Sequence, residues 1–153
     1  MAGKSADEWF AEYELSHRNP VNKRIHWICV PVIAAAFLGL LWELPAPRQS
    51  WITINWSVVA MLAALAFYVH LSLRLAVGMA IAFALLACGF IAYRQTLATP
   101  LWIPSLALFV IAWIGQFIGH QIEGKKPAFF QDLQFLLIGP AWVLRDFYRR
   151  MGW

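Results

Sequence analysis

Four long apolar stretches, separated by short polar connections, constrain the fold of this chain more than any other feature of its sequence. They cover residues 25–42, 52–73, 75–93 and 101–120. A helix needs roughly 20 residues to cross a hydrocarbon core about 30 Å thick, and each stretch is close to that length. Short connections make successive helices antiparallel neighbours. We therefore predict an all-α membrane protein with a four-transmembrane-helix bundle.

The composition supports a membrane protein over a soluble one. Hydrophobic residues make up 61% of the 153 residues and charged residues only 13%, whereas soluble domains have about 25% charged residues. A soluble fold of this size leaves too much surface exposed to hide so many apolar side chains. We predict a single integral membrane domain over residues 1–153. Cys29 and Cys88 lie in apolar runs without CxxC spacing, so we interpret them as buried thiols.

The distribution of basic residues predicts the orientation in the membrane. Four crossings put both chain ends and the second-to-third connection on one side, and ten of the twelve basic residues fall there. The other side has only Arg48 and Arg94. By the positive-inside rule, both termini are expected in the cytoplasm. This bias accounts for the net charge of +4 without nucleic-acid binding, and the small extramembrane portion favours a bacterial inner membrane over the endoplasmic reticulum.

The segment before the first stretch, residues 1–19, predicts an interfacial helix. Ser5 and Glu8 form a capping-box pattern that starts it. Asn19 and Pro20 are expected to end it and to serve as N-cap and first residue of the next helix. An aromatic stripe at four-residue spacing would lie on one face of this helix and contact the membrane surface: Trp9, Tyr13 and His17.

The segment after the last stretch, residues 121–153, is expected to form a cytoplasmic, interfacial tail. Its apolar run over residues 133–144 is too short to span a bilayer. Gly139 and Pro140 interrupt that run, which predicts two short interfacial helices rather than one.

The histidines suggest where chemistry takes place, because all four are expected near the cytoplasmic interface: His17, His26, His70 and His120. Asn22 shares a helical face with His26, and Glu123 shares one with His120. His70 stands in an apolar helix, where a polar ring normally has a functional partner. Isolated interfacial histidines are often only hydrogen-bonded or snorkelling rings. For the four together, we favour a metal site.

Two motifs resemble those of a small membrane family of 2-hydroxy fatty acid dioxygenases. The first is the run His-Arg-Asn-Pro-Val-Asn-Lys-Arg-Ile-His over residues 17–26. The second, over residues 116–128, resembles its counterpart approximately and contains His120, Glu123, Pro127 and Ala128. Together with the helix count and the length, these motifs extend the resemblance over the whole chain.

The resemblance implies an Fe(II)-dependent α-oxidation, in which a long-chain 2-hydroxy fatty acid loses one carbon as CO2 while O2 is consumed. It implies metal ligation by the four histidines, with Glu123 as a further ligand or as an orienter of His120. Asn22 would bind the substrate or support a ligand. Four basic residues are candidates to pair with the substrate carboxylate: Arg18, Lys23, Arg24 and Lys125. Histidines combined with a carboxylate are typical of non-haem iron oxygenases.

Other classes of function stay open at the level of sequence. A zinc-dependent or two-iron membrane lipid enzyme would also use histidines, although four are few for two irons. A non-enzymatic scaffold or metal-binding protein would need no substrate site. A transporter is expected to place polar groups near the bilayer midplane, and the apolar stretches hold few. No Gly-rich nucleotide-binding loop is present. The oligomeric state cannot be read from the sequence.

Overall fold

The computed structural model describes residues 4–45, 48–49, 52–53, 55–126 and 134–153, and within them the chain is almost entirely helical. Two short strands, β1 and β2, pair antiparallel between the second and third helices. The elements follow the order α1 (Ala6–Glu14), α2 (Pro20–Glu43), β1 (Arg48–Gln49), β2 (Ile52–Thr53), α3 (Trp56–Leu71), α4 (Leu73–Thr96), α5 (Trp102–Glu123) and α6 (Phe135–Arg150).

In the part of the chain that the structure describes, three helices are long and apolar enough to cross a membrane: α2, α4 and α5. A further apolar helix, α3, has 16 residues and is shorter than the predicted segment 52–73. Its start is set by Asn55, whose side-chain oxygen accepts hydrogen bonds from the backbone N–H groups of Ser57 and Val58. Its end is set by Ser72, which is extended and joins α3 directly to α4. The all-helical, membrane-compatible class is thus confirmed, with three rather than four helices of full spanning length among the described residues.

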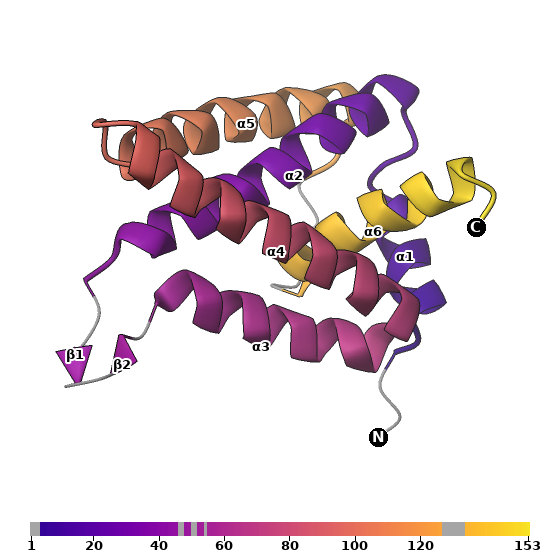
Figure 1. Ribbon diagram of the computed structural model, residues 1–153. Helices are drawn as coiled ribbons and strands as arrows, with labels where there is room; N and C mark the ends of the chain where they lie inside the picture. The colour runs from indigo at the N-terminus through magenta and orange to yellow at the C-terminus, as the bar shows by residue number, and fades with distance from the viewer. Residues whose placement is uncertain (1–3, 46–47, 50–51, 54, 127–133) are drawn as a thin grey trace.

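The helices place both described chain ends, the start of α2, the α3–α4 junction and the end of α5 at the same end of the molecule (Figure 1). The β1–β2 hairpin and the α4–α5 connection lie at the opposite end. Helices α2 and α5 pack most extensively against each other. At Gly119 of α5 this approach is so close that an added Cβ would collide with the Asn22 side chain.

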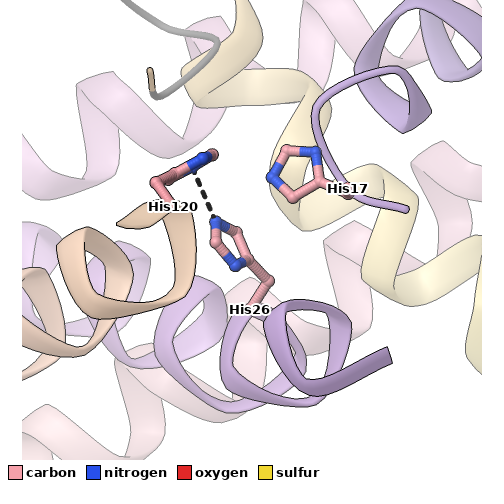
Figure 2. Close-up of side chains that lie close together, drawn as sticks. All are labelled: His17, His26 and His120. Atoms are coloured by element: carbon pink, nitrogen blue, oxygen red, sulfur yellow. Dashed lines mark hydrogen bonds between the residues drawn. The ribbon is translucent and has the colours of Figure 1, made fainter. Parts of the chain in front are cut away.

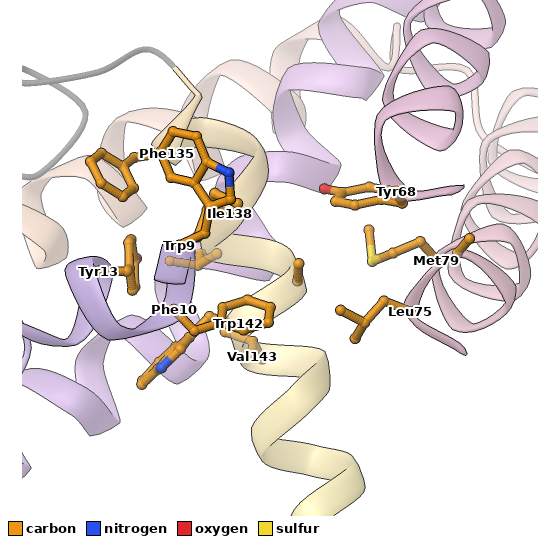
Figure 3. Close-up of a cluster of buried hydrophobic side chains, with 13 residues drawn as sticks. Trp9, Phe10, Tyr13, Tyr68, Leu75, Met79, Phe135, Ile138, Trp142 and Val143 are labelled. Atoms are coloured by element: carbon orange, nitrogen blue, oxygen red, sulfur yellow. The ribbon is translucent and has the colours of Figure 1, made fainter. Parts of the chain in front are cut away.

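The N-terminal helix starts as predicted, with both hydrogen bonds of the Ser5–Glu8 capping box present. It ends at Glu14, however, so the prediction that the helix reaches His17 is wrong. The expected membrane-facing stripe is also buried against α6 instead of exposed. Figure 3 shows Trp9, Phe10 and Tyr13 packed beside Phe135, Ile138 and Trp142, and these six side chains are all buried.

The C-terminal segment forms one described helix, α6, rather than two, and residues 127–133 lie outside the described part. Pro140 lies inside this helix, where it costs one backbone hydrogen bond. The helix continues because α6 packs on α1, α2 and α4 along its length. Gly139 allows the approach of Tyr13 and Val30, to which an added Cβ would come within 3.3 Å. The Tyr68 hydroxyl donates to the Leu137 carbonyl at 2.9 Å and joins α3 to α6.

Candidate metal centre

His17 lies in the short connection between α1 and α2, and its ring is almost completely buried, with 1% exposure. The ring stacks on Tyr13, with ring centroids 4.1 Å apart and planes 15° apart. Its Nδ1 lies 2.6 Å from the Tyr13 carbonyl oxygen. Because α1 ends at Glu14, three residues before His17, the backbone can turn the ring inward, toward α2 and α5 (Figure 2).

His26 and His120 come from helices that pack against each other. Asn19 caps α2 through its side chain, and Pro20 opens the helix, as predicted. Two turns later, His26 is buried and its Nδ1 lies 3.0 Å from the Asn22 carbonyl oxygen. His120 is buried in the last turn of α5, and its Nε2 lies 3.1 Å from Nε2 of His26 (Figure 2).

The carbonyl contacts assign the tautomers of two rings. A carbonyl oxygen can only accept, so Nδ1 of His17 and Nδ1 of His26 each carry the proton. In the neutral rings, Nε2 then has a free lone pair. Nε2 of His17 is buried and has no hydrogen-bond partner among the described residues. Nε2 of His26 faces Nε2 of His120, whereas Nε2 of His17 stays buried and unpartnered, a costly arrangement unless a proton donor or a cation completes it.

The electrostatic surroundings keep His17 neutral. Burial lowers the pKa of His17 to about 4, and the neighbouring His120 acts in the same direction. The hydrogen bond to the Tyr13 carbonyl and the charge of Glu123 oppose this shift but are outweighed. At pH 7 the ring is thus unprotonated at Nε2, which is the form that binds metal ions.

The three histidines fit a metal ion. One ring nitrogen from each lies within 4.8 Å of those of the other two. Bonds of about 2.1 Å to one ion place neighbouring nitrogens roughly 3 to 3.5 Å apart. The His26–His120 pair already has this spacing, and His17 needs a small adjustment. The carbonyl contacts of His17 and His26 also resemble the hydrogen bonds that orient metal-binding histidines.

Glu123 does not join the converging donor atoms, although it was a candidate ligand. Its carboxylate accepts hydrogen bonds from the backbone N–H groups of Arg18 and Asn19, both at 2.8 Å. It also accepts one from the side chain of fully buried Asn22 at 3.0 Å. Glu123 therefore holds the connection that carries His17 against the end of α5. Asn22 links this carboxylate to the Ser16 carbonyl, at 3.2 Å.

We expect Glu123→Gln to weaken metal binding without abolishing it. The amide has a single acceptor oxygen, so one or more donors of the connection lose a charged partner, at a cost of about 1 to 2 kcal/mol of unfolding free energy. Changes in groups that orient ligands typically weaken metal affinity 10- to 100-fold. Chelator competition and thermal melting measure the two effects. Glu12→Gln, which removes an exposed ion pair with Lys4, is the control. Complete loss of metal with an unchanged melting temperature would instead make Glu123 a ligand.

His70 lies outside the cluster of His17, His26 and His120. It lies exposed near the end of α3 and belongs to no group of converging ligand atoms among the described residues. The sequence placed it at the correct end of the molecule, but its direction around the helix turns it away. The candidate metal centre therefore contains three of the four predicted histidines.

The four basic residues predicted to bind the substrate carboxylate do not line the apolar cavity next to the histidines. Arg18 is exposed, and Lys125 donates to the Leu15 carbonyl at 2.8 Å. Lys23 and Arg24 line a different pocket, between α2 and α6. Of the four, Lys23 acts electrostatically on His17.

An apolar cavity of about 470 Å³ opens directly from the histidines. Its wall on α2 continues from His26 at helical spacing to Phe37 and Leu38, and its wall on α5 continues from His120 to Phe109. Leu38 is twelve residues beyond His26, which corresponds to about 18 Å along the helix axis. Apart from the histidine end, the lining is almost entirely hydrocarbon and aromatic.

Two site residues were missed by sequence reasoning. Tyr13 was interpreted as a membrane-facing aromatic residue, yet it holds His17 through its backbone and its ring. Gln116, which is buried and lines the cavity, lies one turn before His120. A buried amide in an apolar helix, four residues before a histidine, was the available signal for Gln116.

Comparison with known proteins gives matches over almost the whole chain. The family model described as 2-hydroxy-palmitic acid dioxygenase Mpo1-like matches residues 3–151. The 2-hydroxy-palmitic acid dioxygenase MPO1 of Saccharomyces cerevisiae is 30% identical over 142 residues, which cover 92% of this chain and 78% of the yeast protein. No solved structure matches the chain significantly.

Proposed function

Because this chain belongs to the Mpo1-like family of 2-hydroxy-palmitic acid dioxygenases, we propose that it is an iron-dependent enzyme that shortens long-chain 2-hydroxy fatty acids. The observation that carries this proposal is the junction of three buried histidines with an apolar cavity. A fatty acid has the same two parts, a polar head and a hydrocarbon tail.

The reaction balances without a further reductant. A 2-hydroxy acid and O2 give a carboxylic acid one carbon shorter, CO2 and water. The substrate loses four electrons as C1 leaves and C2 becomes a carboxyl carbon, and these reduce O2 completely. Iron(II) bound by the histidines would supply the O2-activating redox chemistry and open positions for the substrate.

The residues of this chain would hold and orient the reactants. Neutral His17, His26 and His120 would ligate through ring nitrogens, with Tyr13 and Asn22 fixing two rings through their carbonyl groups. The cavity would take the acyl chain, exclude water and hold C1 and C2 at the histidine end. At roughly 1.25 Å per carbon, the projection of a 1.52 Å bond, 18 Å accepts about 14 carbons. Lys23 would add positive charge near the carboxylate.

The proposed membrane placement has four crossings with both termini in the cytoplasm, in a bacterial inner membrane. Helix α3 has 16 residues, equivalent to about 24 Å, so it would cross where the bilayer thins locally to match it. The concentration of basic side chains at the end with the two termini supports this orientation. The histidines would then lie at the interface, at the depth of a fatty acid head group.

Metal analysis and O2 uptake test the proposed function. Protein purified without oxygen is expected to contain about one iron per chain. Adding 2-hydroxypalmitate should consume one O2 per substrate and yield a fifteen-carbon acid and CO2. Palmitate, which lacks the hydroxyl group, should consume none. If the protein contained zinc in place of iron and hydrolysed a lipid ester, it would be a zinc-dependent hydrolase and the proposed oxidation would be wrong. If the protein bound neither metal, the alternative of a non-enzymatic membrane scaffold would be favoured.

A further inference from the structure

A second pocket, of about 720 Å³, lies between the first turns of α2 and the second half of α6. It shares no lining residue with the histidine cavity. Its charged lining consists of five basic and two acidic side chains, an excess of three positive charges: Lys23, Arg24, Arg145, Arg149 and Arg150, with Glu14 and Asp146. They come from two segments, residues 14–24 and 145–150, that are more than 100 positions apart in sequence, so the fold assembles this charge.

The acidic residues of this pocket are already engaged. Asp146 accepts hydrogen bonds from the Trp27 indole N–H and from Arg150, each at 2.8 Å. Glu14 accepts one from the Trp142 indole N–H at 3.2 Å. Asp146 thereby holds the Arg150 guanidinium beside the Trp27 ring, 5.1 Å from its centroid.

Arg145 forms an ion pair with Asp7 at 3.0 Å, and the positive charge that remains on the other basic residues is available to an anion. Arg24 and Arg149 are exposed and form no ion pair with any described residue. Arg150 uses its Nε on Asp146, which leaves its terminal nitrogens as donors. Guanidinium groups bind phosphate oxygens through paired hydrogen bonds. The pocket therefore has the composition of a phosphate site with two indole rings at its wall.

We propose that this pocket binds the phosphate head group of an anionic membrane lipid. The inference rests on the membrane placement proposed above and is independent of the reaction. Trp27 and Ile28 belong to α2, a helix able to span the membrane, and the Ile28 side chain is 68% exposed. The pocket thus stands where the apolar surface of α2 gives way to charge, the depth of lipid phosphates. An acidic peptide would bind the basic side chains but would make no use of the exposed apolar surface around Ile28, whereas the acyl chains of a lipid would contact it.

Thermal melting of the detergent-solubilised protein, titrated with lipid, tests the proposal. Phosphatidylglycerol should raise the melting temperature saturably, and phosphatidylcholine should not. Arg24→Gln and Arg149→Gln should each weaken the response about fivefold, the effect of one interfacial cation. Lys126→Gln removes the same charge from an exposed position outside the pocket and should respond like wild type.

The other outcomes separate the possible ligands. Saturation by inorganic phosphate alone at similar concentrations would overturn the lipid assignment in favour of a free anion. Preference for polyglutamate over phosphatidylglycerol would overturn it in favour of an acidic protein. Equal weakening in Lys126→Gln would show nonspecific charge attraction and refute the site. Release of the chain from membranes by alkaline carbonate would refute the membrane placement itself, which the melting experiment does not test.

Discussion

His26→Gln and His120→Gln are each expected to remove iron and to lower 2-hydroxypalmitate turnover by well over 100-fold. Altering a group that merely orients a ligand costs 10- to 100-fold in affinity or activity, so losing a ligand costs more. Each ring contributes a buried nitrogen to the 3.1 Å pair at the centre of the cluster. Glutamine retains polarity and approximate size, which limits damage to packing. Iron content and O2 uptake are the measurements, with thermal melting to verify folding.

His70→Gln is the matched control for these variants. The same substitution falls on an exposed residue outside the cluster, so iron content and turnover should stay at wild-type levels. If His70→Gln lost iron as completely as His26→Gln, a fourth ligand would be required and the three-histidine centre would be incomplete. If all three variants retained iron, the metal would be bound elsewhere.

The sequence could place the histidines by depth but not by direction. Charge and hydropathy predict the end of each helix at which a residue lies. All four histidines do belong to helix ends or connections that lie at one end of the molecule in Figure 1: the α1–α2 connection, the start of α2, the end of α3 and the end of α5. Whether a ring points inward depends on helix rotation and on where the backbone leaves a helix. His17 turns inward because α1 ends at Glu14, three residues earlier, and His70 points outward from α3. Neither direction follows from residue spacing alone.

Local capping rules predicted the helix starts well, whereas tertiary packing decided the flanks. The Ser5 capping box and the Asn19–Pro20 start depend on neighbouring residues, and both are present. Whether Trp9 would face lipid or protein depended on which of the two covers that face of α1, and α6 covers it. The same packing carries α6 through Gly139–Pro140, against the local preference for a break. Such long-range partners leave no signal in a single sequence.

Filling the cavity is expected to change the preferred chain length of the substrate. Ala60 and Ala64 line the cavity from α3, and Ala64 is one turn nearer to the end of α3, which lies at the same end of the molecule as the start of α2 and the end of α5. Ala64→Phe should shorten the usable cavity by about 6 Å more than Ala60→Phe, because four residues of helix rise that far. At roughly 1.25 Å per carbon, this corresponds to four or five carbons.

Turnover of 2-hydroxy acids with 10 to 18 carbons measures this shift. Compared with Ala60→Phe, four more methylenes of 2-hydroxypalmitate would lose burial worth about 0.8 kcal/mol each in Ala64→Phe, so kcat/KM should be roughly 200-fold lower. Shorter acids should be affected little, which a general loss of folding or of iron could not produce. Ala63→Phe, on the exposed side of the same helix, adds the same ring outside the cavity and should keep the wild-type profile. A uniform loss across all chain lengths in Ala64→Phe, or an unchanged profile, would mean that the acyl chain lies elsewhere. The histidines would then face a cavity that serves another purpose.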